Sequence, residues 1–127
     1  MRYVGRQLAA LSILLMMTTP VHAENWSNHD TAWEATYMAV HLADWGQTRD
    51  IAAHCNGDLN YYEKNPLLGS CPSTTTVDVY FLTTGVLHYK IAQTLSPRYR
   101  RMFQVGTLAL QINSINNNKK IGLKISF

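Results

Sequence analysis

The order of hydrophobic and polar positions along the chain predicts three helices. The segment 31–54 contains one Gly and no Pro and is rich in Ala, Leu, Met and Trp, which favours a helix. The apolar run 77–95 predicts a second helix. Ser96 and Pro97 indicate the end of that helix and the start of a third, because Ser caps helix N-termini and Pro suits the first helical position. We expect the third helix to continue to about Asn116.

Side-chain spacing assigns faces to the predicted helices. In the first helix, polar residues recur at the i, i+4, i+7, i+11 spacing: Tyr37, His41, Asp44 and Thr48. A second stripe holds small residues, which would let another helix approach closely: Ala35, Ala39, Ala43 and Gly46. In the third helix, the apolar spacing predicts a buried stripe: Met102, Val105, Ala109 and Ile112. Thr75 and Asp78, three residues apart, predict a capping box at the start of the second helix.

The remaining segments are predicted to be irregular or extended. Asn-Gly, Asn-Pro and Leu-Gly pairs between residues 55 and 72 indicate a structured loop. The tail 121–127 alternates apolar and polar residues, which is the period of an extended segment. We therefore expect an all-α fold: a three-helix bundle with a short extended C-terminal tail, formed by a single domain over 24–127.

Residues 1–23 have the organisation of a cleavable signal peptide. Arg2 and Arg6 form a basic start, residues 8–17 are uncharged and mostly apolar, and the run 21–23 (Val-His-Ala) satisfies the small-x-small rule of signal peptidase. The apolar stretch is much shorter than the roughly 20 residues that span a bilayer. We expect an exported protein that is periplasmic or associated with the bacterial envelope. An uncleaved anchor is the alternative.

Cys55 and Cys71 are the two cysteines of the chain, and they bracket the predicted loop. In an exported protein such a pair favours a disulfide, which would close the loop and tie the ends of two helices together. The alternatives are a metal site, which would need further ligands such as His54, and a pair of free thiols.

Charge is distributed unevenly along the chain. Loss of Arg2 and Arg6 with the leader leaves nine Lys and Arg residues against eight Asp and Glu residues. All eight acids lie before residue 79, whereas residues 98–127 hold six basic residues and no acid. The two halves are expected to pair with each other, or the basic part docks on an envelope protein or an anionic membrane surface. Export makes nucleic acid an unexpected partner.

A three-span protein of the inner membrane is an alternative, because three stretches have about the required length. Charge placement disfavours it: with the amino end outside, the cluster of Arg98, Arg100 and Arg101 would also lie outside, against the positive-inside tendency. Within the helices, four polar side chains would also need partners or water in the bilayer: His41, Asp44, His88 and Lys90.

Asp44 is the first candidate for chemistry, because it is the one acid between Glu34 and Asp50 on a helix with mainly apolar and aromatic neighbours. A buried, unpaired carboxylate is costly, so Asp44 needs a partner. We interpret it as part of a polar cluster that fixes the register of the helices. The candidate members are His41, Asp44, Gln47, Thr48, Glu63, Asn65 and His88.

A small metal-dependent hydrolase that uses Asp44, His41, His88 and Glu63 is the alternative. A His–Asp pair can hold a metal or transfer a proton. The sequence contains no HExxH motif or comparable ligand spacing. The residues therefore favour a non-enzymatic binding or structural role, with no cofactor and no metal site.

Two segments of the sequence resemble segments of other proteins. Residues 44–49 read DWGQTR and residues 61–69 read YYEKNPLLG. They resemble a group of small, uncharacterised exported or membrane-associated bacterial proteins, in which an Asp-x-x-Gln-Thr helix is followed by a Glu-x-Asn-Pro-x-x-Gly loop. The resemblance implies a bacterial origin and an envelope location, and it implies no activity. Because Pro66 fixes the backbone beside them, Glu63 and Asn65 are placed to cap or close a site near Asp44.

Cleavage after Ala23 is directly testable. Intact-mass or Edman analysis of protein recovered from an exporting host should give Glu24 as the first residue, because the small-x-small site ends at Ala23. A mature species that retains Arg2 would contradict the signal-peptide assignment.

Overall fold

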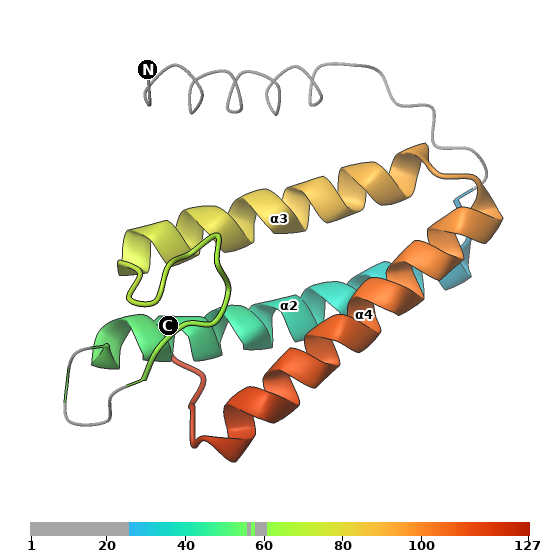
Figure 1. Ribbon diagram of the computed structural model, residues 1–127. Helices are drawn as coiled ribbons and strands as arrows, with labels where there is room; N and C mark the ends of the chain where they lie inside the picture. Colours follow the sequence, from blue (N-terminus) through green and yellow to red (C-terminus); the bar gives the residue numbers. More distant parts are fainter. Residues whose placement is uncertain (1–25, 56, 58–60) are drawn as a thin grey trace, which may run out of the picture.

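The computed structural model describes residues 26–55, 57 and 61–127 and shows three helices in a V-shaped arrangement (Figure 1). The helices are α2 (Asn28–His54), α3 (Thr74–Thr94) and α4 (Pro97–Lys120). α2 packs against both other helices, whereas α3 and α4 meet near the turn that joins them and diverge from there. The predicted all-α fold of three helices is confirmed. The predicted signal peptide and its cleavage site lie outside the described residues.

A capping box fixes the start of α2. The side chain of Ser27 accepts a hydrogen bond from the backbone N–H of Asp30 (3.1 Å), and the Asp30 carboxylate accepts one from the N–H of Ser27 (2.9 Å). The two bonds satisfy donors that would otherwise be left without partners at the helix start. α2 therefore begins three residues before the position expected from its apolar content.

α3 begins at a different cap from the predicted one. The hydroxyl of Ser73 accepts a hydrogen bond from the backbone N–H three residues on (3.1 Å), so the predicted capping box of Thr75 and Asp78 is wrong. Asp78 has partners on α2 instead. Its carboxylate accepts hydrogen bonds from Trp45 Nε1 (2.8 Å) and from Arg49 Nη1 (2.6 Å to Oδ2). These bonds join the start of α3 to the second half of α2.

α4 has its faces reversed relative to the prediction. The apolar stripe that was expected to be buried is exposed: Met102, Val105, Ala109 and Ile112. The buried positions of α4 are Arg100, Gln104 and Leu108. The reason lies on α2, where Asp30, Glu34 and His41 are also buried and need hydrogen-bond partners. Periodicity shows that a helix has two faces, but the facing helix decides which of them is buried.

The seam between α2 and α4 is therefore polar at its closed end. Arg100 Nη1 donates to the carboxylate of Asp30 at 3.1 Å, and Arg100 Nε donates to the Ala92 carbonyl at 2.8 Å. Gln104 Nε2 donates to Glu34 Oε2 at 2.9 Å and to the Asp30 carbonyl at 3.1 Å. Burial by itself would raise the pKa of Asp30, but hydrogen bonds from Ser27 and Arg100 outweigh it and lower this pKa. Asp30 and Arg100 thus form one ion pair between the acidic and the basic part of the chain.

A small apolar core fills the other part of the molecule. Leu68 of the loop packs with Val77 and Phe81 of α3, and Trp45 of α2 covers them. The rings of Trp45 and Phe81 are stacked with centroids 6.1 Å apart. This core holds α2, α3 and the loop together in the part of the molecule where α4 diverges from α3.

The C-terminal tail is extended and packs on α2. The Lys124 N–H donates to Asp50 Oδ2 (2.9 Å), and the Ser126 N–H donates to the Gly46 carbonyl (3.1 Å). A Cβ at Gly46 would lie 2.5 Å from a methyl carbon of Ile125. At Gly46, the predicted stripe of small residues therefore allows close approach of the C-terminal tail and not of another helix. α4 runs to Lys120, four residues beyond the predicted end.

The predicted disulfide is confirmed: Cys55 at the end of α2 is bonded to Cys71 just before α3, with an S–S distance of 2.07 Å. It closes the loop that carries Glu63 and Asn65. For the three-span alternative, none of the helices in the described part of the chain is both long enough and apolar enough to cross a membrane.

Loss of the Arg100 side chain should destabilise the fold strongly. Arg100→Met leaves the Asp30 carboxylate buried without its cation, and we expect the free energy of unfolding to fall by about 3–5 kcal/mol. Urea denaturation of wild type and variant measures this difference.

Arg101→Met is the matched control, because the Arg101 side chain is half-exposed and lies 3.9 Å from Asp30. A partly exposed pair contributes little, so the control should cost no more than about 1 kcal/mol. If both variants lost the same free energy of unfolding, the buried pair would contribute no more to stability than the partly exposed one.

Candidate functional site

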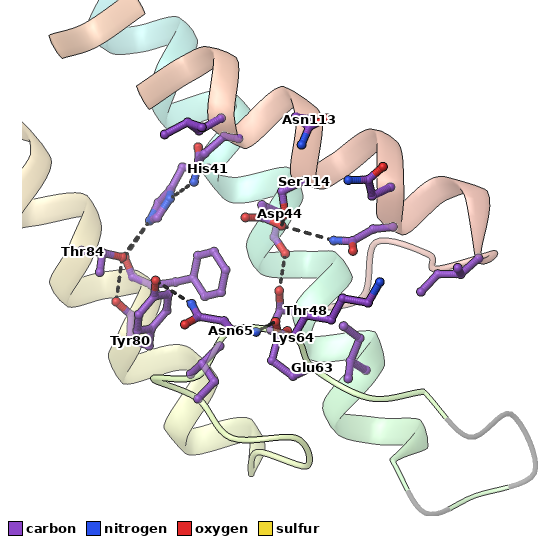
Figure 2. Close-up of a pocket in the computed structure, with 18 of the residues that line it drawn as sticks. His41, Asp44, Thr48, Glu63, Lys64, Asn65, Tyr80, Thr84, Asn113 and Ser114 are labelled. Atoms are coloured by element: carbon purple, nitrogen blue, oxygen red, sulfur yellow. Dashed lines mark hydrogen bonds between the residues drawn. The ribbon is translucent and has the colours of Figure 1, made fainter. Parts of the chain in front are cut away.

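The site is a cavity of about 440 Å³ between the diverging helices and the disulfide-closed loop (Figure 2). Polar side chains from α2, α3, α4 and the loop line it. Asp44 reaches it from α2 and Glu63 from the loop, while Ser114 and Asn113 approach from α4. The cavity exists because α2 contacts both neighbours while α3 and α4 separate, leaving space that the loop covers on one side.

Hydrogen bonds within the loop position Glu63 and Asn65. Glu63 Oε1 accepts from the backbone N–H of Asn65 (2.7 Å), and Asn65 Oδ1 accepts from the N–H of Leu67 (3.0 Å). The Asn65 amide donates to the hydroxyl of Tyr80 on α3 (2.8 Å). The Asx turn ahead of the rigid Pro66 thus holds the loop against α3. The Glu-x-Asn-Pro run builds this wall of the cavity.

The Asp44 carboxylate is held only loosely. Its Oδ1 lies 3.4 Å from both Ser114 Oγ and Asn118 Nδ2, and no ion pair to Asp44 occurs among the residues that the structure describes. Burial raises the pKa of Asp44 to about 6; the negative charge of Glu63 adds to the rise, and the hydrogen bond from Ser114 opposes it. The site therefore holds a carboxylate whose charge is poorly compensated.

His41 is neutral and fully hydrogen-bonded. Its Nε2 lies 2.9 Å from the Phe81 carbonyl, which can only accept, so Nε2 carries the proton. Its Nδ1 then accepts from Gln111 Nε2 at 2.6 Å. Burial lowers the pKa of His41, although the bond to Phe81 opposes this change. His41 lines the cavity and fixes the orientation of the Gln111 amide.

The Gln111 amide has one buried acceptor without a partner. Because its NH₂ group faces the His41 ring, its Oε1 is turned elsewhere. That buried oxygen has no hydrogen-bond partner within the described part of the chain. An unsatisfied buried acceptor is costly, so the fold gives up stability to hold the Gln111 amide in this orientation.

The structure brings together five of the seven predicted cluster residues on the cavity: His41, Asp44, Thr48, Glu63 and Asn65. Two lie elsewhere. Gln47 is buried and accepts a hydrogen bond from Asn118 (3.1 Å), and His88 is buried between Glu34 (2.9 Å) and Thr107 (2.8 Å). His88 therefore serves the polar seam and does not face Asp44.

The positions and hydrogen bonds of the four proposed metal ligands do not favour the hydrolase alternative. Both ring nitrogens of His41 and both of His88 are in hydrogen bonds with protein groups. Across the described residues, no group of three or more His, Cys, Asp or Glu side chains could hold a metal ion. The four proposed ligands do not form one cluster in this fold.

Sequence reasoning missed the contribution of α4 to the site. The apolar stripe predicts the wrong buried face, although polar residues of α4 also recur at helical spacing, at steps of seven, three and four: Gln104, Gln111, Ser114 and Asn118. The first helix shows the same kind of spacing at Tyr37, His41, Asp44 and Thr48. Matching polar spacings on two helices are the signal that would have indicated the seam.

Comparison of the chain with protein-family models, with curated proteins and with solved structures finds no match. The resemblance drawn from the DWGQTR and YYEKNPLLG runs stays a prediction.

The raised pKa of Asp44 predicts a pH-dependent stability difference. Its pKa is 3.8 in the unfolded chain and about 6 in the fold, so the native state binds more protons within this range. Below pH 3.8 Asp44 is protonated in both states and does not lower the free energy of unfolding. As the pH rises through 6, its ionisation lowers this free energy progressively. The largest loss is about 3 kcal/mol.

Asp44→Asn removes this titration and keeps the side-chain shape. Relative to wild type, the variant should gain up to about 3 kcal/mol of stability between pH 4 and pH 7.5. Urea denaturation of both proteins at each pH measures the gain. A stability difference that does not change with pH would show that Asp44 titrates normally.

Proposed function

We propose that this chain is an exported, non-enzymatic binding protein of the bacterial envelope, and that its cavity binds a small organic ammonium compound. The signal-peptide pattern supports export. One observation carries the ligand class: two carboxylates, Asp44 and Glu63, line the cavity, and neither has an ion-pair partner among the described residues.

An ammonium group supplies what these acceptors lack. It brings the charge that Asp44 and Glu63 need, and its N–H groups can donate to their carboxylate oxygens. An ammonium about 4 Å from a carboxylate gains about 4 kcal/mol at an effective dielectric constant of 20, before desolvation is subtracted. Four aromatic side chains also line the cavity, and ring faces attract cations: Tyr37, Tyr62, Tyr80 and Phe81.

The cavity volume favours a molecule over a bare ion. About 440 Å³ falls within the range of small-molecule sites, roughly 300–1,000 Å³. A metal ion would leave most of that space to water. The hydroxyl oxygens of Thr84 and Ser114 and the amide of Asn113 also line the cavity and can contact the polar groups of a larger ligand.

Calorimetric titration with ethanolamine, 1,4-diaminobutane and tetramethylammonium tests the proposal. The two primary amines should bind more tightly than tetramethylammonium, which has the charge but no N–H donor. Affinity should fall as the pH drops below about 6, because Asp44 then loses its charge. Equal binding of neutral 1-butanol would contradict the proposed ligand class.

Two adjacent variants give opposite expectations for the amine affinity. Glu63→Gln keeps the acceptor for the Asn65 N–H but removes the charge, and it should weaken binding about 10- to 100-fold. Lys64 also lines the cavity, so Lys64→Met removes a repelling cation and should strengthen binding. Equal effects of the two variants would show that charge in the cavity does not control affinity.

A further inference from the structure

The outer face of α4 carries an apolar row that the described structure leaves uncovered. Tyr99, Met102, Val105, Ala109 and Ile112 follow one another at steps of three and four residues, and all of them are exposed. Tyr99 and Met102 are each 61% exposed, and Val105 is 39% exposed. A helix in water normally turns such a row toward the core. Here the polar seam with α2 occupies the inner face, so the row needs another partner.

Basic residues flank the row at both ends. Arg98 and Arg101 lie among the first five residues of α4, and Lys119 and Lys120 lie in its last turn. Residues 102–118 contain no charged side chain, and residues 98–127 contain no acid. Arg98, Lys119 and Lys120 are exposed and form no ion pair within the described residues. The row and its flanks therefore present aliphatic side chains between two groups of cations.

We propose that this face of α4 docks on a lipid bilayer that contains anionic phospholipid. The aliphatic side chains enter the boundary between headgroups and acyl chains, and the flanking cations contact headgroup phosphates. Long Lys and Arg side chains suit this role, because their stems cover apolar surface while their charged ends stay hydrated. Tyr99 at one end of the row is of the type enriched at membrane interfaces.

A second copy of the chain fits this face poorly. Antiparallel packing of two α4 helices would place Arg98 and Arg101 opposite Lys119 and Lys120, and parallel packing would place each group opposite itself. Either arrangement brings like charges together, which disfavours association. An anionic bilayer offers the complementary charge. This proposal is independent of the ligand cavity, which opens on the inner side of α4.

Vesicle flotation tests the proposal with protein recovered from an exporting host. Vesicles are made of phosphatidylcholine alone or with about a third phosphatidylglycerol, at low and high salt. We expect binding to the anionic vesicles that weakens at high salt, and little binding to the neutral vesicles. Equal binding to both vesicles, or none to either, would overturn the proposal.

Variants assign any binding to this face, and they carry the same N-terminus as wild type, so a retained leader would contribute equally. Val105→Glu should reduce vesicle binding at least ten-fold, and Lys119→Gln with Lys120→Gln should reduce it about 25-fold, five-fold for each charge. The matched control is Leu67→Glu on the loop, where Leu67 is 78% exposed, and it should bind as wild type. Circular dichroism checks that each variant is folded.

Three results would count against the assignment to α4. Undiminished binding of folded Val105→Glu would place the contact elsewhere. Equal loss in Leu67→Glu would show a general effect of added negative charge. A dimer in sedimentation that Val105→Glu abolishes, without vesicle binding by wild type, would make a second copy the partner of this face.

Discussion

A carboxylate that leaves water must regain hydrogen bonds inside the protein, and the seam between α2 and α4 is built on this requirement. Asp30 and Glu34 are buried at the closed end of the V, and Arg100 and Gln104 supply the donors they need. A rotation of either helix by one residue would separate these groups at once. The seam therefore fixes the register of the two longest helices, a role for which buried polar groups are well suited.

The same constraint shapes both surfaces that we interpret functionally. Because α4 turns its polar side chains inward, its aliphatic row faces outward and needs a partner outside the chain. Toward the open end of the V, the Asp44 carboxylate has only long contacts of 3.4 Å, compared with 3.1 Å between Asp30 and Arg100. The charge of Asp44 is poorly compensated there, and this is what makes the cavity a candidate for a cationic ligand.

The disulfide reduces the conformational entropy that the loop loses when it is held in place over the cavity. The Cys55–Cys71 disulfide joins its ends, which in the chain-entropy model contributes roughly 3 kcal/mol for a loop of this length. The bonds from Asn65 to Leu67 and to Tyr80 then set its shape against α3. Glu63 is thereby held across the cavity from α4 by groups that need no contact with a ligand.

The sequence by itself determined the local features: three helices, the break at Ser96 and Pro97, the loop and the pairing of the two cysteines. Each depends on neighbours in the chain or on the presence of only two thiols. Only the tertiary structure decided that α4 buries Gln104 and exposes Val105, and that His88 pairs with Glu34 and not with Asp44. The physical reason is that a buried polar side chain is stable only opposite its partner, and the partner lies on another helix.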